Sequence, residues 1–120
     1  MKSLTSQEEQ LMKYVWKLKK GFIKDFRGMY PENERPPYTT IASIMKKLEE
    51  KGYVSAKQYG NCYEYRPKVE KENFKNKLIS DLVSNYFQNS YKKMVNFFAQ
   101  KEKLSEEDLE EIINIIKKKK

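Results

Sequence analysis

The chain of 120 residues is long enough for one domain, or for one small domain with an appendage. Its 25 Lys and Arg residues outnumber the 17 Asp and Glu residues, and the resulting net charge of +8 favours a polyanionic partner such as nucleic acid or a membrane surface. The single cysteine cannot form an internal disulfide, and no apolar run is long enough to span a bilayer, so we expect a cytoplasmic protein without membrane insertion.

The N-terminal part of the chain predicts two helices. Thr5 and Glu8 have the spacing of a capping box, in which each side chain accepts the backbone N–H of the other residue, so a first helix begins here. We expect Gly21 to end this helix, and residues 22–29 to form a second, shorter amphipathic helix. The second helix stops before Pro31, because a residue that precedes proline disfavours the helical conformation.

A third helix is predicted from about Thr39 to Lys51, and its two faces differ. Four apolar residues recur at helical spacing and form a stripe for a core, namely Ile41, Ile44, Met45 and Leu48. The opposite face carries small hydroxyl residues and lysines, namely Thr39, Thr40, Ser43, Lys46 and Lys47. Short side chains let the backbone approach base edges and lysines reach phosphates, which suits a helix in the DNA major groove. A solvated amphipathic helix is the alternative.

Two strand-like runs follow over residues 53–59 and 62–66, with Gly60 and Asn61 between them. A turn of this type between β-favouring segments is a strong hairpin signal. Three helices followed by a hairpin make a winged helix-turn-helix, in which the third helix reads the groove and the hairpin, or wing, flanks it. Lys57, Tyr59 and Asn61 are then expected to contact the DNA backbone, the alternative being that they are plain surface residues.

Residues 69–120 predict helices without strands, so the fold class is mainly α (α+β), with a winged-helix DNA-binding domain over 1–68 and a helical dimerisation domain over 69–120. So short a segment cannot bury three apolar stripes in a core of its own, whereas packing against a second copy would bury them. Packing back onto the winged domain is the alternative. The expected dimerisation residues are Phe74, Leu78, Leu82, Tyr86, Met94, Phe98, Leu109, Ile112, Ile113 and Ile116.

Four segments spread over nearly the whole chain carry a family resemblance. They read LTSQEEQLM at 4–12 with Trp16, YTTI at 38–41 with Lys47 and Leu48, KGYV at 51–54 with YEYRP at 63–67, and VNF at 95–97 with EKLSEE at 102–107. In these segments the chain resembles the penicillinase repressors of the BlaI/MecI/CopY type, a family of winged-helix bacterial transcription regulators. The tail segment is the most specific, because generic winged helices do not share it.

The resemblance implies a homodimeric repressor that occupies a palindromic operator in double-stranded DNA. In antibiotic-responsive members, a membrane sensor-protease signal leads to cleavage of the tail at an Asn–Phe bond, and the matching positions here are Asn96 and Phe97. The alternative is that both are ordinary helix residues. Copper-responsive members carry a C-terminal cysteine cluster that this chain lacks, so we expect neither copper sensing nor a cofactor.

The favoured function is therefore sequence-specific repression of transcription. The alternative is a winged-helix interaction module whose basic face docks an acidic protein partner, because its composition would be much the same. An enzyme fits poorly. With no histidine, no glycine-rich phosphate loop and one cysteine in a hairpin, a nucleophile has no evident base, and a metal site has too few ligands.

Overall fold

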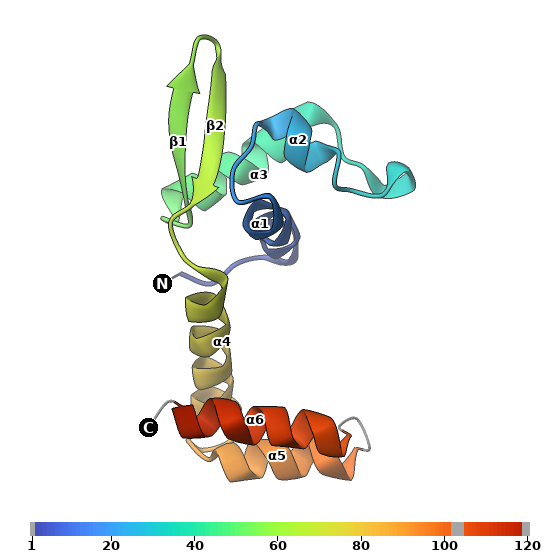
Figure 1. Cartoon of the computed structure of the whole chain (residues 1–120), viewed down its shortest axis with the longest axis vertical. Helices are drawn as coiled ribbons and strands as arrows, with labels where there is room; N and C mark the ends of the chain where they lie inside the picture. The colour runs from blue at the N-terminus through green and yellow to red at the C-terminus, as the bar shows by residue number, and fades with distance from the viewer. Residues whose placement is uncertain (1, 102–104, 119–120) are drawn as a thin grey trace. The chain divides into compact units, whose positions relative to one another are not determined.

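The computed structural model describes residues 2–101 and 105–118 of the chain (Figure 1). It divides into two compact units, residues 1–74 and 75–120, which are described separately. Within the described ranges, no helix combines the length and the apolar character needed to cross a membrane. The elements are, in order, α1 (Ser6–Leu18), α2 (Ile23–Arg27), the 3-10 helix η1 (Glu32–Glu34), α3 (Tyr38–Glu50), β1 (Val54–Tyr59), β2 (Cys62–Pro67), α4 (Lys71–Tyr86), α5 (Tyr91–Gln100) and α6 (Glu106–Lys118).

The first helix begins as the sequence predicts but ends earlier. The hydroxyl of Thr5 accepts the Glu8 N–H at 3.2 Å, and the Glu8 carboxylate accepts the Thr5 N–H at 2.9 Å, so the predicted capping box is confirmed. Lys19 adopts the left-handed conformation that ends the helix, with φ 72° and an N–H that donates to the carbonyl of Val15. The prediction that Gly21 ends α1 was therefore wrong.

Gly21 instead joins the α1–α2 connection to the hairpin. Its N–H donates to the carbonyl of Tyr65 at 3.0 Å, and the N–H of Tyr65 donates to the carbonyl of Gly21 at 2.8 Å. A Cβ at Gly21 would lie 3.1 Å from the ring of Phe26, so the close approach favours glycine. This bridge holds β2 against the start of α2, which is shorter than the predicted range 22–29.

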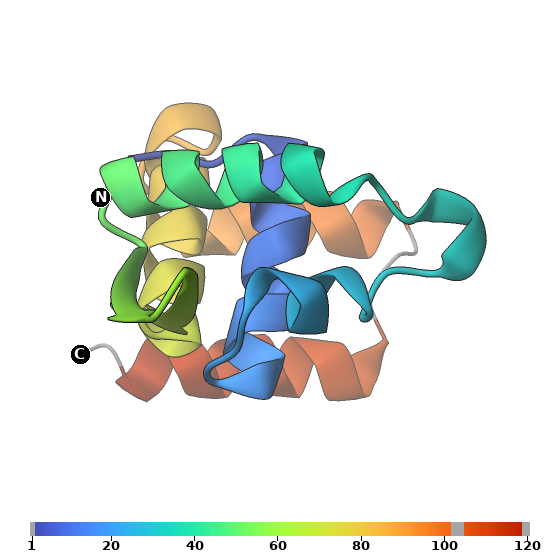
Figure 2. The same cartoon turned by 90° about the horizontal axis from the view of Figure 1, so that it is seen from above.

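The core of the first unit is built on the apolar stripe of α3. The four residues of this stripe are buried as predicted, namely Ile41, Ile44, Met45 and Leu48. Helix α3 crosses α1 (Figure 2), and its stripe packs on buried residues of α1, α2 and the hairpin base, namely Leu11, Met12, Val15, Ile23, Phe26, Tyr53 and Val54. Full burial of one such side chain contributes about 1.5–3 kcal/mol, so the stripe determines which face of α3 meets solvent.

The hairpin forms where the sequence predicts it. Strands β1 and β2 are antiparallel, Tyr59 faces Cys62, and Gly60 in the turn has φ 60°, a left-handed conformation that glycine adopts without steric cost. Val54 at the base of β1 is buried, whereas residues 57–63 are exposed. The order of three helices and a hairpin is that of the predicted winged helix.

The first unit continues past the predicted boundary at residue 68. The indole N–H of Trp16 donates to the carbonyl of Val69 at 2.8 Å, which ties the chain after the hairpin to α1. The ring of Phe74 lies 5.3 Å from that of Trp16 and 5.9 Å from that of Tyr53, and only 8% of Phe74 is exposed. The start of α4 therefore completes the core of the first unit.

The second unit consists of α5, α6 and most of α4. The hydroxyl of Ser90 accepts the Lys93 N–H at 3.1 Å and caps α5. Ser105 and Asp108 form the reciprocal bonds expected of a capping box, at 3.1 and 3.2 Å, before α6. Val83 and Met94 are buried, and an aromatic cluster joins α5 to the end of α4 through the rings of Phe87, Phe97 and Phe98.

The expected dimerisation residues lie in different environments. Phe74 is buried in the core of the first unit, and Met94 is buried in the second unit. The side chains of Leu109 and Ile116 lie outside the described residues. Those with partly or largely exposed side chains are Leu78, Leu82, Tyr86, Phe98, Ile112 and Ile113.

Candidate nucleic-acid interface

The polar face of α3 is fully open to solvent. All five side chains proposed for DNA contact are exposed, namely Thr39, Thr40, Ser43, Lys46 and Lys47. Within the described part of the chain, none of them makes an ion pair or a side-chain hydrogen bond. The first acid on α3 is Glu49, near its C-terminal end. This face therefore carries uncompensated positive charge beside short hydroxyl side chains.

The N-terminal turn of α3 also favours an anion. Pro37 occupies the position before the helix and supplies no side-chain cap, and the first turn contains no acidic residue. The unpaired N–H groups of a helix start carry a partial positive charge, which nearby negative groups stabilise. The electrostatics of the turn thus add to those of the two lysines further along α3.

The outer part of the hairpin presents a second basic group. The Nζ of Lys57 lies 5.2 Å from the centroid of the Tyr59 ring, a cation–π arrangement, and both side chains are exposed. Glu64 faces Lys57 across the hairpin, but its carboxylate pairs with Arg66 at 3.0 Å. The charge of Lys57 is therefore not neutralised by its cross-strand neighbour.

A cleft of about 420 Å³ connects the hairpin with the start of α3. Its lining residues come from α2 and its N-terminal flank, α3 and the hairpin, namely Phe22, Ile23, Lys24, Tyr38, Tyr59, Cys62 and Tyr63. Sequence reasoning identified Tyr59 among these but missed Lys24, Tyr38 and Tyr63 as surface groups of the same site. Tyr38 stands directly before the threonines in the YTTI segment, which was the available signal.

A separate hollow of about 370 Å³ lies on the other side of α3. Thr40 and Ile44 of α3 line it together with residues of α1 and of the segment before α3, namely Gln7, Gln10, Tyr30, Glu34 and Pro36. Burial and the neighbouring Tyr14 raise the pKa of Tyr30 to about 12, so its phenol is neutral at physiological pH. The hollow is lined by polar groups and the acid Glu34 and by no lysine or arginine, so it offers hydrogen bonds but no positive charge.

Two arginines hold the loop that positions the start of α3. The Nε of Arg27 donates to the carbonyl of Pro36 at 2.8 Å, and a terminal nitrogen of Arg35 donates to the carbonyl of Tyr30 at 3.0 Å. Both bonds are charge-assisted, which makes them stronger than bonds between neutral groups. The two arginines thus fix the position at which α3 begins, although neither belongs to the exposed polar face of that helix.

The other end of α3 is fixed by a buried ion pair. Glu8 is 2% exposed, and its carboxylate accepts a hydrogen bond from the Nζ of Lys51, which also donates to the carbonyl of Ser3 at 3.0 Å. Burial alone would raise the pKa of Glu8, but the hydrogen bonds from Lys51 and Thr5 outweigh it and hold the pKa below its usual value. Glu8 is therefore ionised at neutral pH and anchors the C-terminal end of α3 to α1.

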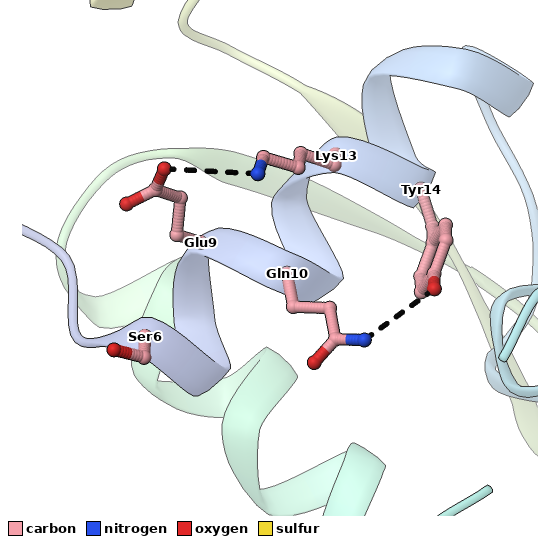
Figure 3. A pocket seen from close by; sticks show the side chains of 5 residues that line it. All are labelled: Ser6, Glu9, Gln10, Lys13 and Tyr14. Carbon is pink, nitrogen blue, oxygen red and sulfur yellow. Dashed lines mark hydrogen bonds and ion pairs between the residues drawn. The ribbon is translucent and has the colours of Figure 1, made fainter. Parts of the chain in front are cut away.

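A third hollow, of about 470 Å³, lies along the exposed side of α1 (Figure 3). Its polar groups pair with one another: Glu9 faces Lys13 at 3.9 Å, and the amide of Gln10 lies 3.5 Å from the hydroxyl of Tyr14. No set of three or more potential metal ligands gathers here or elsewhere among the residues that the structure describes. This hollow has neither the charge nor the unpaired donors of the α3 face.

Comparison of the sequence with known proteins identifies a family of repressors. The sequence model of the penicillinase repressor family matches residues 4–118. The chain is 24% identical over 116 residues to the methicillin resistance regulatory protein MecI of Staphylococcus aureus strain N315, and 25% identical over 117 residues to that of Mammaliicoccus sciuri. Both alignments cover 97% of this chain and 94% of the relative.

One solved structure supports the fold independently. The solution structure of the DNA-binding domain of the repressor BlaI superposes with a TM-score of 0.52 at 20% identity. The match covers 61% of this chain and 93% of that domain. At this identity the likeness concerns the fold, and it confirms the winged helix predicted from the sequence.

Proposed function

Because the chain belongs to the penicillinase repressor family, we propose that it represses transcription by placing α3 in the major groove of a specific DNA operator. The observation that carries the proposal is the exposed face of α3, on which unpaired lysines lie beside short hydroxyl residues and no acid precedes Glu49. Steric access and charge both favour DNA at this face. The adjacent hairpin adds Lys57 at the side of the groove.

The polar residues of α3 fall into two groups according to the length of their side chains. Thr39, Thr40 and Ser43 have side chains short enough to let α3 approach base edges, and their hydroxyls can donate or accept. Lys46 and Lys47, with Lys57 and Tyr59 on the hairpin, would bind phosphate oxygens and hold the register of the protein on the duplex. The threonines would then determine sequence preference, and the lysines mainly affinity.

The repressor would bind as a homodimer through the helices of its second unit. The observation that supports a homodimer is the apolar surface that the second unit leaves exposed, above all at Leu78, Tyr86 and Ile113. A two-fold axis between the copies would present two α3 helices to one duplex, with half-sites about 34 Å apart, so the operator would be palindromic. Two linked contacts bind far more tightly than one.

A sensor-linked protease would inactivate the repressor by cutting the unit that joins the two subunits. Asn96 and Phe97 lie inside α5, with Asn96 exposed and the ring of Phe97 held 5.6 Å from that of Phe87. A protease takes its substrate in an extended form, so α5 must open locally before the bond is cut. Cleavage would separate α6 from the winged unit, and each half-site would bind with its own weaker affinity.

A mobility-shift titration tests the proposal directly. The duplex is the intergenic DNA upstream of the protein's own gene, and unrelated duplex of equal length is the competitor. Preferential retention of the upstream DNA is expected. Equal binding to both duplexes would overturn specific repression and would favour a basic face that docks an acidic protein partner.

A further inference from the structure

We propose that the cleft between α2, α3 and the hairpin holds one sugar–phosphate segment of the duplex, with Lys24 as its phosphate-binding cation. This inference rests on the proposed function and assigns a contact to Lys24, Tyr38 and Tyr63, which are not among the five α3 residues already proposed to contact DNA. All three are exposed, and they converge from three different elements on one cleft. The occupant is a segment of backbone because the cleft adjoins the helix that enters the groove.

The chemistry of the cleft matches that occupant. Its lining contains one lysine, three tyrosine hydroxyls and no acid. Tyrosine rings can pack against a deoxyribose while their hydroxyls bind phosphate oxygens, and a lysine supplies the opposite charge. Lys24 has no ion pair or side-chain hydrogen bond within the described part of the chain, so its charge is available.

The surroundings of the cleft are basic rather than acidic. Lys20 precedes it in the α1–α2 connection, which the Gly21–Tyr65 bridge holds beside β2, and Lys57 lies next to Tyr59. Asp25 is the acid that follows Lys24, and its carboxylate accepts the N–H of Phe22 at 2.8 Å as the cap of α2. The carboxylate of the residue that follows Lys24 thus already accepts a hydrogen bond from Phe22, which lines the cleft.

The cleft is preformed. The rings of Phe22 and Tyr59 meet edge to face with centroids 6.1 Å apart, and the Gly21–Tyr65 bridge joins the same two segments through two backbone hydrogen bonds. A binding surface whose side chains are already ordered loses less conformational entropy when it is occupied. The walls therefore need no rearrangement before a backbone segment enters.

Cys62 provides a built-in probe, because it is exposed, lines the cleft and is the only cysteine of the chain. Its alkylation by iodoacetamide is followed in the free protein, with upstream duplex, and with unrelated duplex at a salt concentration that suppresses non-specific binding. We expect the upstream duplex to slow the reaction several-fold and the unrelated duplex to leave it unchanged. An unchanged rate in the saturated specific complex would overturn the inference.

Lys24→Gln tests the cation, with Lys13→Gln as its control. Lys13 is an exposed lysine of the α1 hollow, so the control removes the same charge elsewhere on the first unit. For Lys24→Gln the slope of log affinity against log salt should fall by about 0.9 for each subunit bound, and phosphate-ethylation interference should lose one phosphate in each half-site. Lys13→Gln should keep both properties of the parent.

The possible outcomes distinguish failure of the cleft assignment from failure of the proposed function. If the parent prefers its upstream DNA and Lys24→Gln behaves as Lys13→Gln does, the cleft assignment is overturned while the proposed function stands. If the parent itself shows no preference for that DNA, the proposed function fails and the cleft assignment fails with it.

Discussion

The buried carboxylate of Glu8 and the ammonium group of Lys51 join the first turn of α1 to the C-terminal end of α3. The same carboxylate accepts the Thr5 N–H, so Glu8 both begins one helix and anchors another. Removing one partner of a buried pair leaves an uncompensated charge, which costs far more than the pair itself contributes. The placement of α3 therefore depends on a residue that has no part in DNA contact.

Glu8→Gln should lower the free energy of unfolding by about 2 kcal/mol, because it removes the charged hydrogen-bond partner of the partly buried Lys51 ammonium group. Glutamine still fits the capping box, so the change isolates the ion pair. Urea unfolding followed by circular dichroism measures the effect. Glu9→Gln is the control, since the exposed 3.9 Å pair of Glu9 with Lys13 contributes little. Equal stabilities of the two variants would refute the role of the pair.

The parent should lose stability in acid through the same group. The pKa of Glu8 is lowered from 4.5 in the folded protein, so its contribution is fully present above pH 4.5 and is lost as the pH falls through the folded value. The difference in unfolding free energy between the parent and Glu8→Gln should therefore shrink below pH 4.5. A difference that stays constant down to pH 2.5 would contradict this, and urea titrations at several pH values supply the comparison.

Lys47→Ala should weaken binding to the operator and to unrelated duplex alike, and lower the salt slope by about one unit for each subunit bound. The exposed Lys47 side chain makes no ion pair in the described part of the chain, so its loss should leave stability unchanged. Fluorescence anisotropy over a salt titration measures both slopes. A loss confined to the operator would show that Lys47 reads bases instead.

Thr40→Ala should change which sequence is preferred rather than the affinity for all sequences. Loss of one good contact to a base edge costs about 1–3 kcal/mol of discrimination at that position. Selection of bound duplexes from a randomised library compares the variant with the parent. Identical preferences would place Thr40 at the hollow beside α1 without a base contact.

Two substitutions in α4 should have different effects: Phe74→Ala should lower stability, and Tyr86→Asp should weaken dimerisation. Phe74 fills the core of the first unit, so its truncation should cost about 3–5 kcal/mol of stability. Tyr86 is 76% exposed, so an aspartate there should leave folding intact and raise the dimer dissociation constant. Denaturation and sedimentation equilibrium measure the two effects. A fully dimeric Tyr86→Asp protein would remove this surface from the proposed interface.

The sequence predicted those features that depend on local spacing. The stripe of α3 at Ile41, Ile44, Met45 and Leu48, the capping box at Thr5 and the Gly60 turn each arise from residues within one turn or two of one another. Such patterns remain the same whatever the tertiary context. They sufficed to predict the winged helix and the polar face of α3, which the structure leaves exposed.

Contacts between distant segments were not predictable in this way. Gly21 was expected to end a helix, but its partner Tyr65 lies far along the chain, and Lys19 ends α1 although a non-glycine residue there is uncommon. Phe74 shows the helical spacing of an interface residue, yet Trp16 and Tyr53 surround it. The aromatic cleft likewise combines α2, α3 and the hairpin, so no single stretch of sequence reveals it.

The bridge between Gly21 and Tyr65 limits how the protein can adapt to a duplex. A hairpin attached only at its base could swing to follow a groove of any width, but here such a swing would have to break two backbone hydrogen bonds and part Phe22 from Tyr59. In the proposed complex with DNA, the winged unit would therefore act as a rigid template. The double helix would then have to bend, twist or widen to fit, and sequences that deform easily would gain an advantage even at steps that no side chain touches.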